Sequence, residues 1–193
     1  MAKKIIKELL VDGLFFLGVL IVAMLLVKFV VQRTEVDGDS MLPTLQNKDS
    51  IMVDKVSYRF RKPKRFEIIV LQPNLSDPET FYIKRVIALP GETIQILEDG
   101  SILINGEKLY EGYGREVIKE DKRGDAKFPI TLGEDEYFVM GDNRNNSGDS
   151  RDPNIGNIKI SQIKGRAWLR IWPMKSFGLV NKIKPASDTE ITE

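Results

Sequence analysis

The stretch LLVDGLFFLGVLIVAMLLVKFVV, from Leu9 to Val31, sets the architecture of the chain. Its uninterrupted apolar run, Gly13 to Val27, would give about 22 Å of helix, and the continuation to Val31 extends it to the roughly 30 Å of a bilayer core. Lys28 lies near one end, where its aliphatic stem can carry the ammonium to the interface. The sequence therefore predicts one membrane-spanning helix over residues 9–31, preceded by a short tail, residues 1–8.

Two other structures fit the same stretch: the core helix of a soluble domain and a cleaved secretory signal. A cleaved signal needs small residues just after the apolar run, whereas QRTEV (32–36) follows here. A retained anchor fits the sequence better. Three lysines precede the span, whereas only Lys28, near its far end, and Arg33, just after it, are basic on the other side, so the positive-inside rule places the N-terminus in the cytoplasm. We expect a single-pass protein of the cell membrane whose remaining residues lie outside the cytoplasm.

The composition excludes several kinds of site. The 193 residues include no His and no Cys, so imidazole or thiolate catalysis, thiolate-ligated metals and disulfides are impossible. Any acid, base or nucleophile must come from Ser, Thr, Tyr, Lys, Asp or Glu. Five basic and two acidic residues fall among the first 33, which leaves 24 basic and 26 acidic residues in the rest. Nucleic-acid binding, which uses a basic surface, is not expected.

Residues 34–184 are predicted to form one mainly β domain. Short apolar runs alternate with turn residues, and no long amphipathic helix follows residue 40. The pairs Asp99-Gly100 and Asn105-Gly106 are typical of hairpin turns, because both residue types tolerate positive φ. The expected strands are Ile51–Val56, Glu67–Gln72, Phe81–Ala88, Thr93–Leu97, Ser101–Ile104, Lys108–Tyr110, Tyr137–Met140 and Ile163–Trp172. The expected loops are Leu75–Glu79 and Gly112–Lys127, and residues 185–193 are expected to form a loose acidic tail.

The segment GDSMLPT (38–44) contains a serine in a turn-forming sequence. A lone serine in such a segment usually caps a helix or stabilises a turn. Ser40 follows Arg33 by seven residues, so even a fully extended link keeps it within about 25 Å of the membrane surface. Any reaction at Ser40 would therefore act on a molecule presented at the bilayer.

The segment FYIKRVIA (81–88) reads as a strand that contains a lysine. A strand lysine usually faces solvent. Here the two-residue period puts Lys84 on the apolar face of Val86 and Ala88, and it puts Arg85 on the opposite face. Burial of an ammonium on an apolar face lowers its pKa, so that the neutral amine can act as a base. Since the chain has no His, a Ser–Lys pair is the natural form of serine catalysis.

The segment GDNRNNSGDSRD (141–152) is polar, and a surface loop is its simplest interpretation. A calcium loop fits poorly, because an EF-hand count from Asp142 gives no glycine at the turn position and no Glu at position twelve. Asp149 and Arg151 could instead pair and fix the loop, and Ser147 could offer its hydroxyl to a neighbouring amine.

These three segments, in this order behind a membrane anchor, resemble the type I signal peptidases (bacterial leader peptidases), in their single-span Gram-positive form. The matching boxes are Ser-Met-x-Pro-Thr at 40–44, the Lys-Arg box at 82–86 with Pro90-Gly91, and Gly-Asp-Asn to Ser-Arg at 141–151. The resemblance extends over the anchor and most of residues 34–175, including GRAW at 165–168 and Trp172-Pro173.

The resemblance implies a compact β-sheet or barrel-like protease that cleaves signal peptides from exported preproteins after small residues of the Ala-x-Ala type. It implies no metal and no cofactor. It makes Ser40 the nucleophile, Lys84 the general base and Ser147 the residue that orients the lysine amine. Asp149 and Arg151 would be a structural pair behind them. The candidate residues of the apolar substrate pockets are Val36, Met41, Leu45 and Ile83.

The chain departs from the family pattern at two places. Phe66-Glu67 stands where the family usually has Gly-Asp. Gly38 stands where larger members have a serine that donates to the oxyanion, so the oxyanion must rely on backbone N–H groups, first that of Ser40. Two other functions fit the sequence: a membrane-anchored regulatory Ser–Lys protease with one dedicated partner, and a noncatalytic envelope-binding module.

Overall fold

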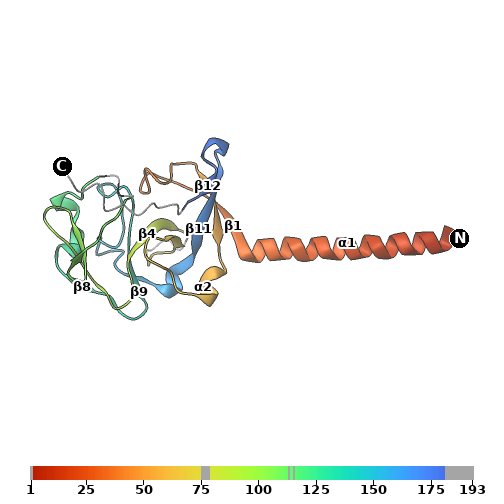
Figure 1. Ribbon diagram of the computed structural model, residues 1–193, viewed down its shortest axis with the longest axis horizontal. Helices are drawn as coiled ribbons and strands as arrows, with labels where there is room; N and C mark the ends of the chain where they lie inside the picture. Colours follow the sequence, from red (N-terminus) through yellow and green to blue (C-terminus); the bar gives the residue numbers. More distant parts are fainter. Residues whose placement is uncertain (1, 75–78, 113, 115, 181–193) are drawn as a thin grey trace.

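The computed structural model describes residues 2–74, 79–112, 114 and 116–180, which form a long helix followed by a mainly β domain (Figure 1). The helix α1 (Ala2–Val30) stands away from the domain and carries the N-terminus at its far end. Within it, Lys4–Leu25 is 22 residues long with a mean hydropathy of 2.3, enough to cross a bilayer, and none of this span is buried. A core helix of a soluble domain would be covered by protein, so that interpretation does not hold.

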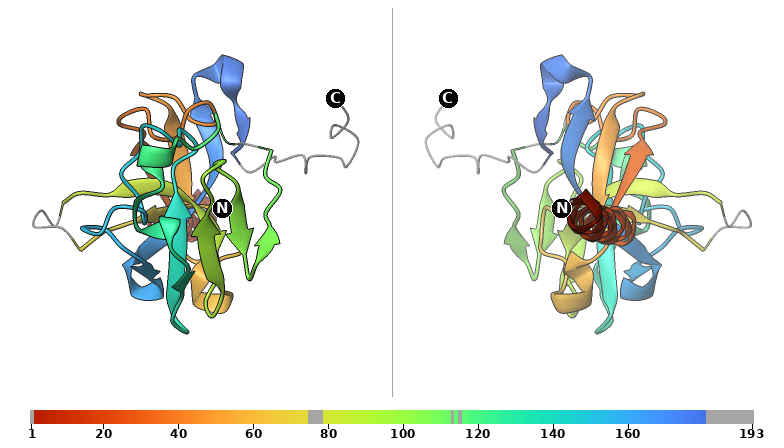
Figure 2. Two further views of the ribbon diagram at one scale, coloured as in Figure 1. Left: turned by 90° about the vertical axis from the view of Figure 1, so that its left-hand side faces the viewer. Right: turned by 90° about the vertical axis from the view of Figure 1, so that its right-hand side faces the viewer.

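The domain is built from two antiparallel sheets, of which the larger is curled (Figure 2). Within the described residues, the larger sheet has the strand order β1-β2-β11-β3-β4-β9-β10, with β12 paired to β11, and the smaller has the order β7-β6-β5-β8. The strands are β1 (Val31–Glu35), β2 (Ser50–Asp54), β3 (Ile68–Leu71), β4 (Tyr82–Ala88), β5 (Thr93–Ile96), β6 (Ile102–Ile104), β7 (Glu107–Lys108), β8 (Ile130–Thr131), β9 (Glu136–Met140), β10 (Ile158–Lys159), β11 (Ile163–Trp172) and β12 (Gly178–Leu179). The short helices are α2 (Ser57–Phe60), η1 (Glu120–Lys122), η2 (Gly124–Lys127), η3 (Ile160–Gln162) and η4 (Met174–Ser176).

The mainly β architecture predicted from the sequence is confirmed, with differences in detail. All eight predicted strands match observed ones within two residues at each end; the one expected at Lys108–Tyr110 lies at Glu107–Lys108. The sequence missed β1, β8, β10 and β12, which are short or polar and depend on a partner strand for their hydrogen bonds, and it missed the four-residue helix α2. The helix α1 also includes residues 2–8, which were expected as a tail. Residues 75–78 and the tail at 185–193 lie outside the described residues.

The larger sheet is covered by apolar side chains on both faces, and β3 shows why. All four residues of β3 are buried: Ile68 and Val70 belong to one core cluster, while Ile69 and Leu71 belong to another. A strand buried on both faces reads as a continuous apolar run rather than an alternating one. The cluster around Val70 also holds residues that flank Ser40, so this core supports the turn that carries the candidate nucleophile.

Candidate active site

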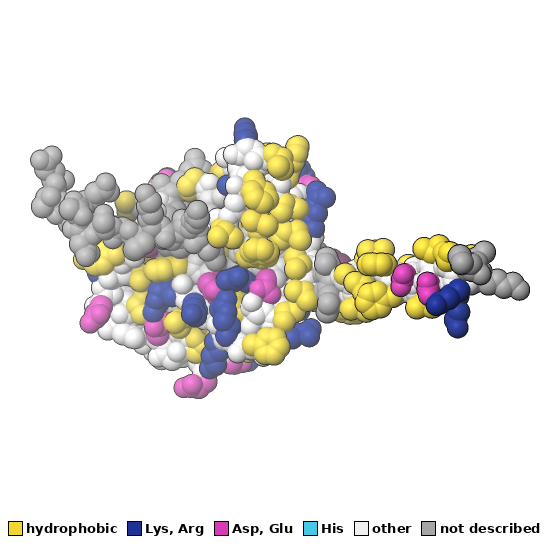
Figure 3. All heavy atoms as spheres, turned by 45° about the vertical axis from the view of Figure 1, so that its right-hand side comes forward, with side chains coloured by type: hydrophobic (Ala, Val, Ile, Leu, Met, Phe, Trp, Pro, Cys, Tyr) yellow, Lys and Arg dark blue, Asp and Glu magenta, His cyan; other side chains and the backbone are white. Residues whose placement is uncertain are grey.

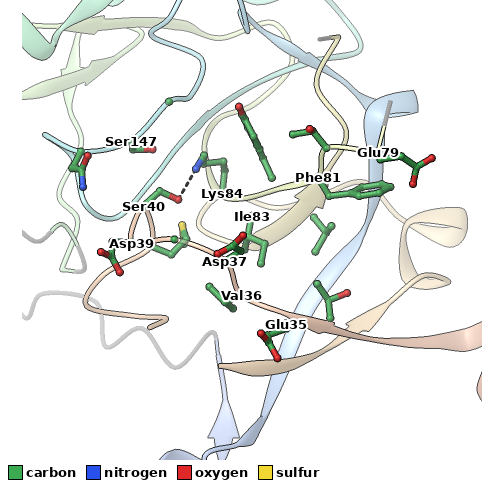
Figure 4. A pocket seen from close by; sticks show the side chains of 18 residues that line it. Glu35, Val36, Asp37, Asp39, Ser40, Glu79, Phe81, Ile83, Lys84 and Ser147 are labelled. Carbon is green, nitrogen blue, oxygen red and sulfur yellow. Dashed lines mark hydrogen bonds between the residues drawn. The ribbon is translucent and has the colours of Figure 1, made fainter. Parts of the chain in front are cut away.

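Three segments that lie far apart in the sequence meet at a cleft of about 670 Å³ (Figure 4). Ser40 lies in the turn that follows β1, Lys84 lies in β4, and Ser147 lies in the loop that follows β9. All three line the cleft. Figure 4 shows the Lys84 amine directed at the Ser40 hydroxyl, with Ser147 beside them. The remaining charged residues of the lining are acidic: Glu35, Asp37, Asp39 and Glu79.

The amine of Lys84 lies at hydrogen-bond distance from the hydroxyl of Ser40. The separation between Lys84 Nζ and Ser40 Oγ is 2.7 Å, and only 4% of Lys84 is exposed. Burial lowers the pKa of Lys84 from 10.5 to about 8. The Asp149 and Asp142 carboxylates oppose this shift, whereas the Arg151 guanidinium adds to it. A substantial fraction of the amine is therefore neutral near pH 8, and a neutral amine can take a proton from the serine.

The backbone of the Ser40 turn is tied to the loop that follows β9. The Asn143 backbone N–H donates to the Ser40 carbonyl over 3.0 Å, and the Asn143 side-chain amide donates to the Asp39 carbonyl over 3.0 Å. Gly141 packs so closely here that a Cβ atom would overlap the Ser147 side chain and the Ser40 carbonyl. Only glycine fits at position 141, and its close packing fixes the distance between the two segments.

Asp149 and Arg151 form a buried ion pair behind the lysine. Arg151 Nε donates to Asp149 Oδ1 over 2.8 Å, and Arg151 Nη2 donates to Asp149 Oδ2 over 2.8 Å. Burial on its own raises the pKa of Asp149, but the hydrogen bonds and charge of Arg151, together with the Gly141 N–H, hold this pKa below its usual value. The pair is therefore charged but internally neutralised, so its net effect on the nearby amine is small.

The Ser147 hydroxyl lies in the same enclosed space. It sits against the Gly141 backbone and near the Asp149 carboxylate, but no hydrogen-bond partner reaches it with good geometry within the described part of the chain. A hydroxyl can rotate to donate or accept, so this group is available to a neighbouring amine.

A second buried ion pair, which sequence analysis did not identify, joins the three segments from beneath. Arg85 and Asp142 are both fully buried, with Arg85 Nε 2.8 Å from Asp142 Oδ1 and Arg85 Nη2 2.5 Å from Asp142 Oδ2. The Thr44 hydroxyl donates to the same carboxylate. The arginine next to the strand lysine could have indicated this ion pair from the sequence, because a buried guanidinium needs a carboxylate partner.

These contacts also bear on the calcium interpretation of the loop. Asp142 is bound to Arg85 and Asp149 is bound to Arg151, so neither carboxylate points to an open site. Among the residues that the structure describes, no cluster of acidic side chains is arranged to hold a metal ion.

The predicted pocket residues divide into two groups. Val36, Met41 and Ile83 line the cleft, whereas Leu45 is fully buried beneath it and does not. The Leu45 N–H donates to the Met41 carbonyl over 2.9 Å, and this turn directs the Leu45 side chain into the core. The cleft is also lined by Val70 and Phe81, which sequence analysis did not include.

One edge of β4 is open beside the cleft. Tyr82 to Lys84 pair with β3, but the pairing with β9 begins only at Arg85. Among the described strands, none pairs with the β9 side of β4 at residues 82–84. An extended peptide could therefore add to β4 at this edge.

The chain is similar to known proteins over most of its length. The family model "Signal peptidase, peptidase S26" matches residues 7–172. A signal peptidase I from Leptolyngbya laminosa is 40% identical over 88% of this chain and 83% of its own. A signal peptidase I from Bacillus caldolyticus is 37% identical over 84% of this chain and 91% of its own. A solved signal peptidase I from Enterococcus faecalis V583 is 32% identical and covers 55% of this chain and 97% of its own, with a TM-score of 0.45.

Proposed function

Because this chain belongs to the signal peptidase family, peptidase S26, and is a serine endopeptidase that cleaves signal peptides, we propose that Ser40 is its nucleophile and Lys84 its general base. The observation that carries this proposal is the 2.7 Å separation between Lys84 Nζ and Ser40 Oγ in an open cleft. The lowered pKa of Lys84 supports it, because a permanently protonated amine could not act as a base. Family membership excludes the noncatalytic envelope-binding module.

The proposed reaction is acyl transfer in two steps. Neutral Lys84 takes the proton of the Ser40 hydroxyl as Oγ attacks the scissile carbonyl, and the resulting ammonium then protonates the leaving amine. Water next attacks the acyl-enzyme with Lys84 again as the base, which releases the second product and restores the free serine. Ser147 holds the amine in line, and the Asp149–Arg151 pair supports the loop that carries Ser147.

The proposed oxyanion donor is the backbone N–H of Ser40. Within the described part of the chain this N–H donates to no acceptor, so it is free for the tetrahedral intermediate. Gly38, which has no side-chain donor, stands two residues before the nucleophile. A backbone N–H that is already oriented stabilises the developing charge without reorganisation.

Substrate recognition is proposed to combine strand addition with small apolar pockets. The open edge at residues 82–84 would hydrogen bond the substrate backbone next to the nucleophile. Val36 and Met41 line the cleft next to Ser40 and are 3% and 1% exposed, so little of either side chain is open to the cleft. An apolar lining beside the nucleophile suits a small apolar side chain such as Ala, and we propose that it selects Ala-x-Ala sites. The proposed substrates are exported preproteins.

We propose that α1 anchors the enzyme in the cell membrane as a single span. The N-terminus would then be cytoplasmic and the β domain extracytoplasmic, in agreement with the lysines before the span. The domain starts at the residue that follows α1, because β1 begins at Val31 and pairs along β2. This connection keeps the cleft close to the bilayer in which signal peptides are held.

The experiment that tests the proposal uses the full chain in detergent and a set of synthetic peptides. Each peptide carries an apolar core and an Ala-x-Ala end, and the sequences that flank the site differ. We expect cleavage of several peptides after the last Ala and no cleavage by Ser40→Ala. Cleavage by Ser40→Ala would contradict the assigned nucleophile. Failure on all peptides but cleavage of one cellular protein would instead indicate a protease with a dedicated partner.

A further inference from the structure

The basic segment that contains α2 and the residues after it is not used by the proposed reaction. Its sequence, YRFRKPKR (58–65), carries five basic residues in eight. Arg61 and Arg65 are bound to Glu67 and Glu92 at 2.7 Å and 2.5 Å. Arg59, Lys62 and Lys64 are exposed, and none of the carboxylates in the described residues lies within ion-pair distance of them. Three uncompensated cations are thus concentrated in six residues.

An exposed aromatic ring lies among these cations. Phe60 is 84% exposed, more than any other large apolar side chain in the described residues. Exposure of a whole phenyl ring is unfavourable in water, whereas an aromatic ring at the boundary of a bilayer is in a favourable environment. A single exposed apolar residue needs no explanation by itself. Its position between Arg59 and Lys62 makes it part of a basic and aromatic surface, which we define as Arg59, Phe60, Lys62 and Lys64.

This surface lies next to the end of the anchor helix. Phe60 lines a cavity of about 400 Å³ together with Val30 and Val31, the last residue of α1 and the first of β1. The Lys55 N–H donates to the Val30 carbonyl over 3.0 Å, so the segment that leads into α2 is bound directly to the helix end. Figure 1 shows α2 on the side of the domain from which α1 leaves, and Figure 3 shows basic and apolar side chains gathered on the face turned towards the helix.

The length of α1 sets the depth of this surface. The apolar sequence of α1 continues past Leu25 to Val30, with Lys28 as the one charged residue in this stretch. A span over residues 9–31, as the sequence predicts, therefore brings the last turn of α1 to the boundary of the hydrocarbon core. Phe60, which lies next to this helix end, would then lie at the level of the headgroups.

We infer that Arg59, Phe60, Lys62 and Lys64 form a docking surface for anionic phospholipid headgroups, which holds the β domain against the bilayer. The inference rests on the proposed anchoring by α1 and adds a second attachment to it. Cations near an anionic membrane are attracted to it, and the attraction is screened by salt. Two attachments fix the orientation of the domain, whereas α1 alone would let it rotate and tilt. A fixed orientation would hold the cleft at a constant height above the bilayer.

The absence of Cys from the chain allows a direct test with a single label. Phe60→Cys in the full-length protein is labelled with an environment-sensitive dye and reconstituted in vesicles of phosphatidylcholine alone or with one third phosphatidylglycerol. We expect blue-shifted emission, quenched by lipid-borne quenchers, only in the anionic vesicles, and its loss at about 0.5 M salt. The matched control is Phe128→Cys, which is also an exposed phenylalanine next to a lysine, near the strand β8 at the far end of the domain.

Charge removal provides the second arm of the test. Arg59→Gln, Lys62→Gln and Lys64→Gln combined should lower the ratio of docked to undocked domain on the order of a hundredfold. The same change at Lys108, Lys119 and Lys127, which are exposed elsewhere, should have little effect. Equal emission in both vesicle types, or no effect of the first triple variant, would overturn the inference. Flotation with the vesicles reports α1 insertion separately, and peptide cleavage in detergent reports an intact fold and the proposed function.

Discussion

Lys84 and Arg85 are neighbours in β4 and both are buried, but a carboxylate contacts the charge of Arg85 and none contacts that of Lys84 within the described residues. The Arg85 guanidinium is bound by the Asp142 carboxylate with two hydrogen bonds and donates a third to the Phe66 carbonyl. The Lys84 amine has a serine hydroxyl at hydrogen-bond distance instead of a carboxylate. Burial without an opposing charge in contact lowers the pKa of Lys84 to about 8.

The difference separates a structural site from a reactive one. At Arg85 the charge is compensated by Asp142, and this ion pair joins the segments that carry Ser40 and Ser147. At Lys84 the charge is left uncompensated, so the folded protein favours the neutral form of the amine. The same strand thus supplies a structural ion pair from one residue and the proposed base from the next. Each of the following predictions tests one side of this contrast.

The largest expected effect is on the reaction at Lys84. Lys84→Arg should reduce kcat/KM by roughly 10⁴-fold or more, because a guanidinium stays charged and cannot accept the Ser40 proton. The measurement is cleavage of an Ala-x-Ala peptide by the full chain in detergent, with Ser40→Ala as the background. Circular dichroism and the melting temperature establish that the variant is folded. Substantial turnover by a folded Lys84→Arg enzyme would exclude Lys84 as the base.

The pH dependence of the wild-type enzyme should follow the titration of the same amine. Below the pKa of about 8, kcat/KM should rise about tenfold per pH unit, and above it the rate should level off. The fall from pH 8 to pH 5 would then approach a thousandfold. A carboxylate base would be ionised and active throughout this range. Full activity at pH 5 would therefore contradict an amine base.

Loss of the Asp142 carboxylate, which compensates the charge of Arg85, should lower the stability of the fold. Asp142→Ala removes the carboxylate that is bound to the fully buried Arg85, which should lower the free energy of unfolding by about 3–5 kcal/mol. The control is Glu120→Ala, which removes an exposed ion pair with Arg123 and should cost no more than about 1 kcal/mol. Urea unfolding followed by tryptophan fluorescence measures both. Equal losses in the two variants would show that the Arg85 site is not a structural centre.

The contrast between the two residues could be predicted from the sequence only in part. The two-residue period of a strand places Lys84 and Arg85 on opposite faces, but it gives neither the depth of each face nor the partner across it. Asp142 lies 57 residues from Arg85, and it becomes the partner only because β4 pairs with β9. The apolar runs predicted most of the strands, because strands that are buried in the core consist mainly of apolar residues.

Other details depend on contacts between distant segments, which a local sequence pattern does not show. The strand β1 (VQRTE) is mostly polar, and it forms because β2 offers hydrogen bonds along its full length. Leu45 was assigned to the substrate pockets by resemblance, but a turn directs it into the core beneath the cleft. The resemblance of three motifs to the signal peptidases implied that Ser40, Lys84 and Ser147 lie together, whereas the close packing at Gly141 between their segments appeared only in the structure.

The uncompensated amine should itself destabilise the fold at neutral pH. The pKa of Lys84 falls from 10.5 in the unfolded chain to about 8 in the folded one, so the penalty is complete below pH 8 and disappears as the pH rises to 10.5. Its size is about 3 kcal/mol. Lys84→Met should therefore be inactive but more stable than wild type at pH 7, with the gain shrinking between pH 8 and pH 10.5. A variant that is less stable than wild type at pH 7 would contradict uncompensated burial.

The smallest expected effect concerns Ser147, whose proposed role is to orient the Lys84 amine without carrying a charge itself. Ser147→Ala should reduce kcat by about tenfold with little change in melting temperature, since its hydroxyl makes no hydrogen bond of good geometry within the described residues. Ser150→Ala in the same loop is the control: the Ser150 hydroxyl accepts the buried Val139 N–H over 3.0 Å, so its loss should cost about 1 kcal/mol of stability and leave kcat nearly unchanged. The pH profile shows whether Ser147 orients the Lys84 amine or only fills space beside it. If Ser147 orients the amine, its removal should change the pH midpoint as well as the rate, because the environment of Lys84 changes. A fully active Ser147→Ala enzyme with an unchanged pH midpoint would contradict the orienting role of Ser147. Lys84 would then be held by Ser40 and by its burial alone.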